Sequence, residues 1–373
     1  MCTDMLTRPN TARPLRIVID PSALAHNLSR LRHARGGRPP RVWAVAKADA
    51  YGHGQAHLLA ALAKADGLAV RDLAEARRVT DLGWRGRILV LGGLFDRHEA
   101  GHLADMSLDL VVGAMDQLDW LAASRVARPP AIWLRWSGDL GHAGFDPRDY
   151  SDAYRRAQAL AAQGRASAVG HLLHYAHAEE PDRRYLCDRA FDLAIRGLPG
   201  PVSRSNSAAL LTAGRSSPSE DWIRPGLALY GASPLPQVDA AALGLRPVMA
   251  LYSAITSVRR LEAGATVGYG GDFIAPAPMR IGIVAAGYAD GYPRNARTGT
   301  PVRVGTCPSR VLGRVGMDTL AVDLSALPAA GVGSPVTLWG DHGLSAERVA
   351  REAGTVAAQL FTGLDPRLAV QLR

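Results

Sequence analysis

Lys47 is the residue in this sequence most suited to covalent chemistry. Of the 43 lysines and arginines, only Lys47 and Lys64 are lysines. Lys47 directly follows the apolar run 42–46 and precedes a turn that contains glycine. A desolvated lysine amine can lose its proton near neutral pH and attack a carbonyl, whereas a guanidinium cannot. Lys47 is therefore a Schiff-base candidate, although a solvated lysine at a strand end would have the same local sequence.

Other polar residues also follow apolar runs, and together they suggest a cofactor. In barrels of alternating strands and helices, the strand ends carry the chemistry and the last two loops commonly bind phosphate. Ser207 and the backbone amides of Gly226 and Leu227 would supply hydrogen-bond donors there. A lysine across a barrel mouth from a phosphate cradle meets the needs of pyridoxal 5'-phosphate. Taken singly, each of these residues also has an ordinary structural explanation.

Later in the chain, Tyr269 lies between glycines in the segment 267–271. The segment could be a simple turn, or it could present the phenol on thinly covered backbone as a proton carrier. The segment 313–318 could offer backbone amides to a carboxylate. These residues are candidates for a second group of functional side chains.

The elements that position these residues form a regular pattern up to about residue 245. Eight apolar runs alternate with helix-like segments, and most of the runs do not alternate with polar residues, so they are expected to be buried on both faces. We predict a (β/α)8 TIM-type barrel; an open doubly wound sheet is second, since no G-x-G-x-x-G follows an early strand. The runs are 42–46, 67–70, 88–92, 109–112, 131–136, 168–173, 202–205 and 222–229.

Beyond residue 245, short alternating runs punctuated by proline and glycine replace the helical patterns. This change predicts a separate, mainly β domain. The predicted organisation is a barrel domain at 15–245, a β domain at 246–373 and an N-terminal extension at 1–14.

Composition excludes several classes of protein. The net charge is +9, but the arginines are dispersed without basic blocks, so we expect no nucleic-acid partner. No run approaches the roughly 18 apolar residues of a membrane span, and the N-terminal segment lacks the apolar core of a secretory signal. Cys2, Cys187 and Cys307 are too few and too scattered for a disulfide framework or a metal cluster. We expect a cytoplasmic protein without a bound metal.

In the order and spacing of its motifs, the chain resembles the alanine racemases almost from end to end. The matching stretches are Ile19-Asp20 through Asn27, Ala46 through Gly54, His174-Tyr175-Ala176, Asn206-Ser207-Ala208, Arg224 through Gly231, Gly268-Tyr269-Gly270, Gly287 through Arg294, and Gly313-Arg314-Val315 with Met317-Asp318.

The resemblance implies a pyridoxal-phosphate-dependent isomerase that interconverts the L and D forms of alanine or another small amino acid. It implies a homodimer in which each site is completed by the β domain of the partner. Lys47 would hold the cofactor, and Lys47 and the partner's Tyr269 would be the two acid/base groups, one on each face of the substrate. Two are needed because a single base tends to return the proton to the face that it left.

The resemblance also assigns the binding residues. The cofactor set is Lys47, Tyr51, His174, Asn206, Ser207, Arg224, Gly226, Leu227 and Tyr288, and the substrate set is His142, Met317 and Tyr288. Arg224 would face the pyridine nitrogen, where a cation discourages ring protonation and so favours reprotonation of the substrate over transamination. A free tyrosine has a pKa of about 10, and a relay of His174 and Arg224 would assist the catalytic phenol.

Four positions depart from the family pattern. Arg135 stands where many relatives carry a carbamylated lysine, and His142 replaces the arginine that binds the substrate carboxylate. A histidine is shorter and cannot make the two-pronged guanidinium contact. Ala358 replaces a tyrosine near the cofactor phosphate, and Gly316 stands where relatives often carry cysteine. The substrate is therefore either alanine, despite these changes, or a different or broader set of amino acids.

Two further hypotheses come from other classes. A related barrel-plus-β architecture serves pyridoxal-phosphate decarboxylases, and single-domain relatives of the barrel bind the cofactor without clear turnover. Arg224 argues against a decarboxylase, because those enzymes generally place an acid at the pyridine nitrogen. A complete β domain with Tyr269 argues against a non-catalytic cofactor-binding protein.

Overall fold

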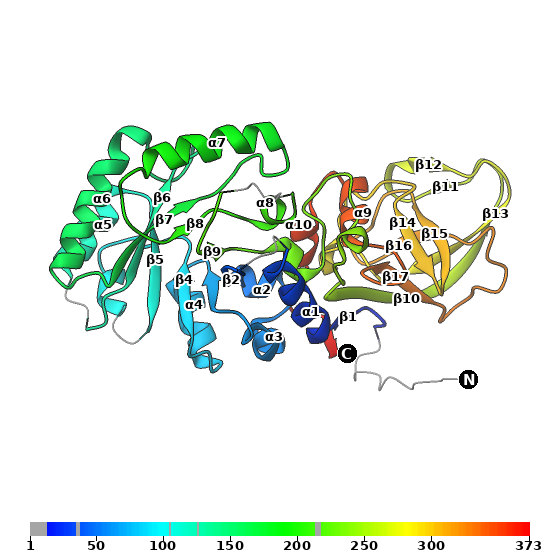
Figure 1. The fold of residues 1–373 in the computed structure, drawn as a ribbon. Helices are drawn as coiled ribbons and strands as arrows, with labels where there is room; N and C mark the ends of the chain where they lie inside the picture. The colour runs from blue at the N-terminus through cyan, green and yellow to red at the C-terminus, as the bar shows by residue number, and fades with distance from the viewer. Residues whose placement is uncertain (1–12, 35–37, 104–105, 125–126, 213–217) are drawn as a thin grey trace. The chain divides into compact units, whose positions relative to one another are not determined.

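The computed structural model describes residues 13–34, 38–103, 106–124, 127–212 and 218–373, which fold into two compact units. One unit is Ser22–Arg246, and the other joins the chain up to Pro21 to Pro247–Arg373 (Figure 1). Residues 15–21, which the sequence analysis placed with the barrel, therefore belong to the β unit. The reason is hydrogen bonding, since the first strand pairs with the strands Met249–Leu261 and Ala369–Leu372 of that unit.

The unit Ser22–Arg246 contains a closed barrel of eight parallel strands, which confirms the predicted (β/α)8 fold. Each strand pairs with the next in sequence, and the last strand pairs with the first. The strands are β2 (Arg41–Val45), β3 (Gly67–Val70), β4 (Arg87–Val90), β5 (Leu108–Val112), β6 (Ala131–Trp136), β7 (Ala168–Leu173), β8 (Val202–Ser203) and β9 (Trp222–Ile223). The predicted run 222–229 is a strand only at its start, because Pro225 and Gly226 lead into a 3-10 turn.

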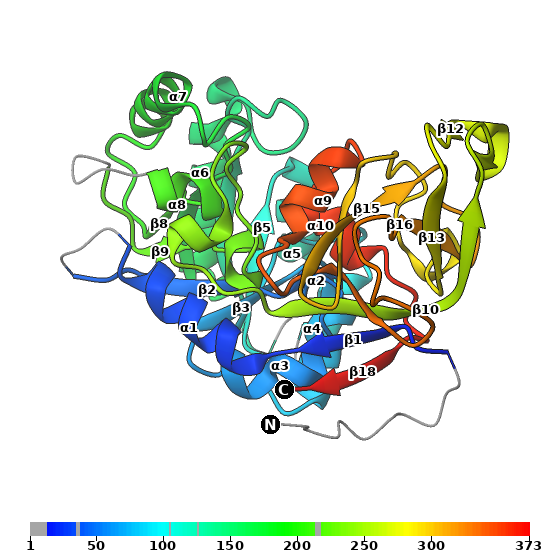
Figure 2. The same ribbon diagram turned by 90° about the vertical axis from the view of Figure 1, so that its right-hand side faces the viewer.

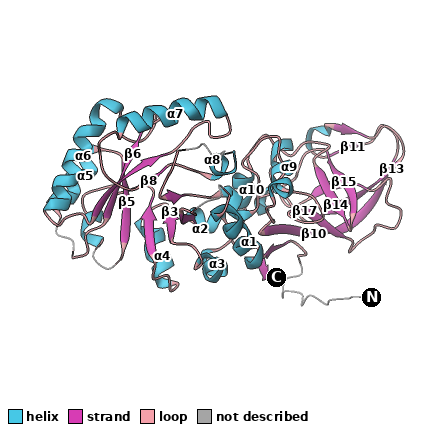
Figure 3. Ribbon diagram, in the orientation of Figure 1, coloured by secondary structure: helices cyan, strands magenta, loops and turns pink. Residues whose placement is uncertain are grey.

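Helices surround these strands, and Figure 3 separates the two kinds of element. The α-helices are α1 (Pro21–Arg32), α2 (Lys47–Tyr51), α3 (Gln55–Leu62), α4 (Leu73–Asp81), α5 (Met115–Ala123), α6 (Pro147–Ala162), α7 (Pro181–Ala194) and α8 (Ser207–Thr212). The 3-10 turns are η1 (Glu99–His102), η2 (Leu227–Tyr230) and η3 (Ala240–Leu243). Helix α6 packs against β6 and β7, which keeps both faces of these strands out of water.

Tryptophan side chains fill the inside of the barrel. The ring of Trp43 stacks on Trp222 with centroids 4.1 Å apart, and Trp133 meets Trp43 edge-on at 6.5 Å. Such aromatic pairs contribute about 0.5–1.5 kcal/mol beyond the area they bury. Gly67 makes room for them, because a Cβ on this residue would lie 2.1 Å from the Trp43 ring. Because these tryptophan side chains fill the interior, space for a ligand remains only above them, in the direction of the C-terminal ends of the strands.

The second unit is built on an eight-stranded sheet with the order β13-β16-β15-β14-β17-β10-β1-β18, in which β13 also pairs with β10. Its strands are β1 (Arg16–Ile19), β10 (Met249–Leu261), β13 (Met279–Val284), β14 (Pro301–Val304), β15 (Cys307–Leu312), β16 (Leu320–Asp323), β17 (Pro335–Trp339) and β18 (Ala369–Leu372). Figure 2 shows β1 between β10 and β18. The mainly β domain is thus confirmed.

Smaller elements complete this unit. The strands β11 (Thr266–Val267) and β12 (Phe273–Ile274) form a hairpin around the 3-10 turn η4 (Tyr269–Gly271). The others are η5 (Tyr288–Asp290), α9 (Ala346–Glu352) and α10 (Ala357–Thr362). Across the described ranges, no helix has the length and apolar character that crossing a membrane requires.

Candidate active site

A cavity of about 510 Å³ lies at the C-terminal ends of the barrel strands, and its lining comes from the barrel unit. It brings together all nine predicted site residues of that unit. These are Lys47, Tyr51, His142, His174, Asn206, Ser207, Arg224, Gly226 and Leu227.

Strand alternation explains why four basic residues meet in this cavity. Side chains two positions apart on a strand point to the same face. The barrel core includes Val45, Trp133, Leu172 and Trp222. The residues two positions further along the chain are Lys47, Arg135, His174 and Arg224. All four therefore face into the barrel, one layer above the tryptophan floor.

The amine of Lys47 lies in surroundings that favour its neutral form. Burial is the largest cause that lowers its pKa, and the Arg135 and Arg71 cations lower it further. The carboxylate of Glu75 acts in the opposite direction. The net effect increases the fraction of free amine at neutral pH, as nucleophilic attack on an aldehyde requires.

The chain leaves Lys47 through a left-handed turn made of ordinary residues. Ala48, Asp49, Ala50 and Tyr51 have φ angles of 54°, 53°, 57° and 52°. Left-handed helical geometry costs an L-residue roughly 1–2 kcal/mol, so surrounding contacts must hold this turn. The strain is concentrated directly beside the candidate nucleophile.

Side chains from neighbouring segments hold the left-handed turn. The Ala48 N–H donates to Oε1 of Glu75 at 2.7 Å, and the Gln55 N–H donates to Oδ1 of Asp49 at 2.9 Å. The Gln55 amide donates to the carbonyl of Ala46 at 3.0 Å. Glu75 also accepts from the N–H of Arg71 at 2.7 Å, which ties the turn to the segment after β3.

A cradle of small polar donors lies where the sequence predicts phosphate binding. Oγ of Ser207 accepts from the N–H of Gly226 at 3.0 Å and of Ala228 at 3.2 Å. A side chain at position 226 would force Tyr51 to shift, because a Cβ there would lie 2.5 Å from Oη of Tyr51. Burial raises the pKa of Tyr51 to about 12, so its hydroxyl remains a donor. These hydroxyls and amides suit a phosphate ester.

Arg224 is buried and its hydrogen bonds fix its orientation. Its guanidinium donates to Oγ of Ser203 at 2.5 Å and to the carbonyls of Leu173 and Arg204. Burial lowers the pKa of Arg224 to about 10, while Glu220 raises it. Arg224 therefore remains a cation at neutral pH, and the oxygens that accept its hydrogen bonds are neutral.

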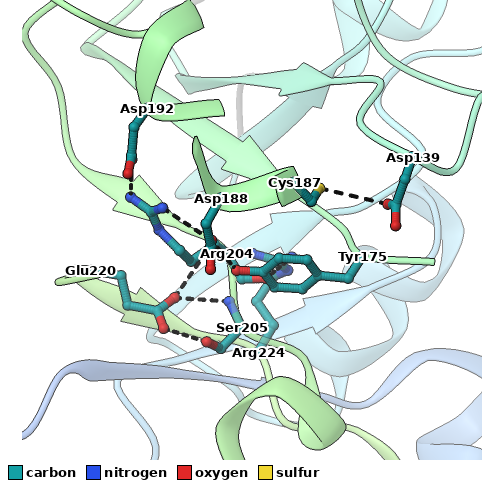
Figure 4. Close-up of polar contacts among 9 residues, drawn as sticks. All are labelled: Asp139, Tyr175, Cys187, Asp188, Asp192, Arg204, Ser205, Glu220 and Arg224. Atoms are coloured by element: carbon teal, nitrogen blue, oxygen red, sulfur yellow. Dashed lines mark hydrogen bonds and ion pairs between the residues drawn. The ribbon is translucent and has the colours of Figure 1, made fainter. Parts of the chain in front are cut away.

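Behind Arg224, an ionic network fixes the segment 203–205 (Figure 4). The carboxylate of Glu220 accepts from the N–H groups of Arg204 and Ser205 at 2.8 and 2.9 Å. The guanidinium of Arg204 turns to Asp188, 3.2 Å away. Because Arg224 binds oxygens of this same segment, the network sets its position. The sequence analysis did not identify Glu220 or Asp188, and they lie outside every motif.

His174 is a neutral imidazole in this site. Burial lowers the pKa of His174 to about 3, and the Arg224, Arg135 and Lys47 cations act in the same direction. Among the described residues, the structure shows no hydrogen bond between the side chains of His174 and Arg224. The relay implied by the family resemblance is therefore not closed in this structure.

The substrate wall contains one predicted residue and one that was noted only as a departure. His142 is exposed at the cavity edge, and its Nδ1 lies 3.3 Å from the carbonyl of Leu140. Arg135 lines the same cavity. The alternation from Trp133 was the signal in the sequence that could have assigned Arg135 to the site.

The remaining predicted residues belong to the β unit and lie at its surface. Tyr269, Tyr288 and Met317 are 65%, 37% and 56% exposed. The guanidinium of Arg294 covers both tyrosine rings, 5.8 Å from the centroid of Tyr269 and 5.3 Å from that of Tyr288. The Tyr288 N–H donates to the carbonyl of Gly316 at 3.0 Å, which joins two of the predicted segments. A phenol and a thioether are thus presented to solvent on ordered backbone.

Two domains known from a single protein family together match most of the chain. The N-terminal domain of alanine racemase matches residues 19–234, and the C-terminal domain of alanine racemase matches residues 248–372. An alanine racemase of Bordetella petrii is 46% identical over 371 residues, covering 96% of this chain and 99% of that protein.

Solved structures agree over the same length. The biosynthetic alanine racemase of Pseudomonas aeruginosa superposes with a TM-score of 0.90 at 39% identity, covering 97% of this chain and 99% of that chain. The alanine racemase of the D-cycloserine producer Streptomyces lavendulae gives a TM-score of 0.86 at 32% identity, with 98% of each chain covered.

Proposed function

Since the chain belongs to the alanine racemase family, we propose that its substrate is alanine and that Lys47 and Tyr269 are its two acid/base groups. The protein is an isomerase that depends on pyridoxal phosphate. Relatives at 46% and 44% identity that are named alanine racemase support alanine as the substrate and do not favour the decarboxylase or the non-catalytic alternative.

The donor set of the cavity fits the cofactor. Lys47 would bind its aldehyde carbon, and Tyr51, Ser207 and the amides of Gly226 and Leu227 would bind its phosphate. The clearance at Gly226 supports this, since any Cβ there would fill the space beside the Tyr51 hydroxyl. When bound, pyridoxal phosphate withdraws electrons from the Cα of an attached amino acid and so makes the Cα proton acidic.

Lys47 Nζ would exchange the Cα proton on one face of the substrate. Its lowered pKa, which results mainly from burial, supports a role as a base near neutral pH. Oη of Tyr269 from a second subunit would serve the other face. Two groups on opposite faces allow a proton to leave from one side and another to arrive on the other, which inverts the centre.

Arg224 would direct the reaction toward racemisation. A guanidinium beside the pyridine nitrogen keeps a proton off that nitrogen, so negative charge stays near Cα and is quenched there rapidly. The hydrogen bonds from Arg224 to Ser203 and Leu173 support a fixed orientation for this charge. Asn206 would assist by ordering the start of α8, where its Oδ1 accepts from the N–H of Ala209 at 2.9 Å.

A homodimer would bring the two halves of the site together. The exposure of Tyr269, Tyr288 and Met317 supports this arrangement, because a racemase base that faces solvent needs a second surface to exclude water. Met317 and Tyr288 would then border the substrate in the partner's cavity.

The observation that carries this proposal is the similarity to alanine racemases over nearly the full length of the chain. Measurement of substrate turnover tests the proposal. The holoenzyme should bring either enantiomer of alanine to an equal mixture in chiral chromatography. In deuterium oxide it should label Cα without releasing carbon dioxide. A panel of the twenty amino acids decides the substrate, because a clear preference for another amino acid would refute alanine. Carbon dioxide release would instead favour a decarboxylase.

A further inference from the structure

Arg135 is an arginine of the active-site cavity whose guanidinium has no partner among the residues that the structure describes. It lies on β6, two residues beyond the core residue Trp133, and lines the cavity. Its Nε is buried and meets no hydrogen-bond acceptor. Throughout the described ranges, its guanidinium makes no hydrogen bond or ion pair. A half-buried guanidinium without a partner is costly unless a ligand supplies one.

The second arginine of the cavity provides a direct contrast. Arg224 directs both of its Nη groups to acceptors of its own chain, namely Oγ of Ser203 and two backbone carbonyls. Among the described lining residues, Glu179 carries the one carboxylate, and that residue is exposed. The cavity therefore holds an excess of positive charge, and of its two arginines Arg135 is the one whose guanidinium has no acceptor among the described residues.

The charge of Arg135 acts on the same space as the reactive amine. After burial, which is the largest cause in each case, the Arg135 cation contributes to the lowered pKa of both Lys47 and His174. Burial also lowers the pKa of Arg135 itself. An anion bound at Arg135 would relieve this concentration of like charges.

The topology of the barrel separates Arg135 from the phosphate cradle. Tyr51 follows β2, whereas Arg135 lies on β6, four strands away in either direction around the closed barrel. Ser207 and Gly226 follow β8 and β9, two and three strands from β6, so a phosphate held by this cradle leaves Arg135 on a separate part of the cavity wall. An amino acid with its Cα beside Lys47 carries a second anion, its carboxylate, into the cavity.

We propose that Arg135 binds the carboxylate of the substrate, in place of the residue at position 142. A guanidinium fork matches a carboxylate with two parallel hydrogen bonds. His142 is less suited, because it is exposed and Nδ1 of its imidazole lies close to the carbonyl of Leu140. This inference rests on the proposed function, since it presumes an amino acid as the ligand.

Propionate tests the contact without turnover, because it carries the carboxylate and methyl group of alanine but no amine. Its binding to the holoenzyme is measured by titration calorimetry, with propionamide as the probe that lacks the charge. Arg135→Gln should weaken propionate binding by about 10- to 100-fold, the usual loss for a charged hydrogen-bonded contact, and leave propionamide unchanged. Arg135→Lys should recover part of the loss, because it restores charge without the fork.

Two further variants serve as a matched control and as a test of the alternative carboxylate-binding residue. Arg148→Gln makes the same chemical change at an exposed residue of α6 and should bind propionate as the unmodified enzyme does. His142→Gln removes the imidazole, which is the alternative group that could bind the carboxylate. The cofactor absorbance of every variant reports that its cavity is intact. For alanine itself, Arg135→Gln should raise KM by a larger factor than it lowers kcat.

The inference is overturned if Arg135→Gln binds propionate as tightly as the unmodified enzyme. It is also overturned if His142→Gln loses as much affinity as Arg135→Gln, or more. The proposed function fails separately, if the unmodified holoenzyme exchanges no Cα proton of any amino acid. An enzyme that racemises alanine with an unchanged KM after Arg135→Gln would refute the carboxylate contact and leave the proposed function standing.

Discussion

At the scale of single residues, the active site is a set of basic groups whose surroundings give each a different protonation state. Arg224 stays charged in spite of burial, with a pKa of about 10, and His174 is neutral, with a pKa of about 3. Burial also lowers the pKa of the Lys47 amine. These differences assign the roles, because one cavity then holds a fixed cation, a neutral donor or acceptor, and an amine that can exchange a proton.

The two lysines of the chain allow a matched test. Lys47→Ala should remove the visible absorption band of the bound cofactor and lower racemisation by more than about 10³-fold, since both attachment and one acid/base group are lost. Lys64→Ala should change neither, because Lys64 is exposed on the barrel surface. Absorbance spectra and chiral chromatography check both variants. A Lys47→Ala protein that keeps the band would show that another group holds the cofactor.

Residue types led to a prediction of this chemistry where one residue type carries the information. Scarcity singled out Lys47 in the sequence, and Ser207 with the amides of Gly226 and Leu227 was predicted as the phosphate cradle; the close approach of Tyr51 to Gly226 emerged only in the structure. Glu220 and Glu75 could not be predicted in the same way. Their roles depend on contacts with backbone N–H groups of distant segments, and an acidic residue in the sequence does not reveal which amide it will meet.

At the scale of elements, the phosphate cradle depends on how closely η2 approaches the turn after Lys47. Gly226→Ala should weaken cofactor binding by about 10-fold or more, because overpacking a tight contact commonly costs 1–3 kcal/mol. The added Cβ would lie 2.5 Å from Oη of Tyr51. Titration of the cofactor-free protein with pyridoxal phosphate, followed by absorbance, gives the affinity.

A second substitution separates the contact from general damage. In Gly226→Ala combined with Tyr51→Phe, the loss of the hydroxyl removes the atom closest to the added methyl group. The double variant should then bind the cofactor better than the sum of the two single losses indicates. Strict additivity would show that Gly226 is required for a reason other than this contact.

An element could be predicted well where the signal for it lies within its own stretch of sequence. The barrel strands were recognisable because each is a continuous apolar run between helical segments. The strand β1 was assigned to the wrong unit, because a strand followed by a helix looks the same in sequence wherever the strand pairs. Its partners β10 and β18 lie more than 200 residues away. The left-handed turn at 48–51 was not foreseen, since alanine normally favours right-handed helices.

At the scale of the whole molecule, buried histidines link stability to pH. Burial lowers the pKa of His53 to about 4, whereas an unfolded chain would have a value near 6.5. The unfolded state therefore binds more protons below pH 6.5, and the contribution of neutral His53 is present above that pH and lost as pH falls toward 4. At pH 5 the loss is about 2 kcal/mol in the free energy of unfolding.

Denaturant unfolding at pH 7 and pH 5 measures this contribution. His53→Gln should reduce the difference between the two pH values, because glutamine does not titrate. His57→Gln, at an exposed residue on α3, should leave the difference as it is in the unmodified protein. Equal pH sensitivity in His53→Gln and the unmodified protein would show that other groups cause the loss of stability.

Residence in the cytoplasm, where such acid conditions are uncommon, stays a prediction.

The proposed sharing of sites between two subunits is a feature that no single chain can display. Lys47 lines the cavity of the barrel unit, and Tyr269 is exposed on the β unit. If each site combines Lys47 of one subunit with Tyr269 of its partner, Lys47→Ala and Tyr269→Phe dimers are each defective at both sites. A mixed dimer of the two variants contains one site with both changes and one site with neither.

Co-expression of the two variants therefore tests the dimer and the catalytic pair together. With equal amounts and random pairing, half of the dimers are mixed and one of their two sites is intact. The mixture should recover about a quarter of the unmodified activity, as the statistics of a two-fold dimer require. Purification through different affinity tags on the two subunits isolates the mixed dimer, which should reach about half. If both residues of a site came from one subunit, the mixed dimer would stay as inactive as its parents, because every site would carry one of the two changes.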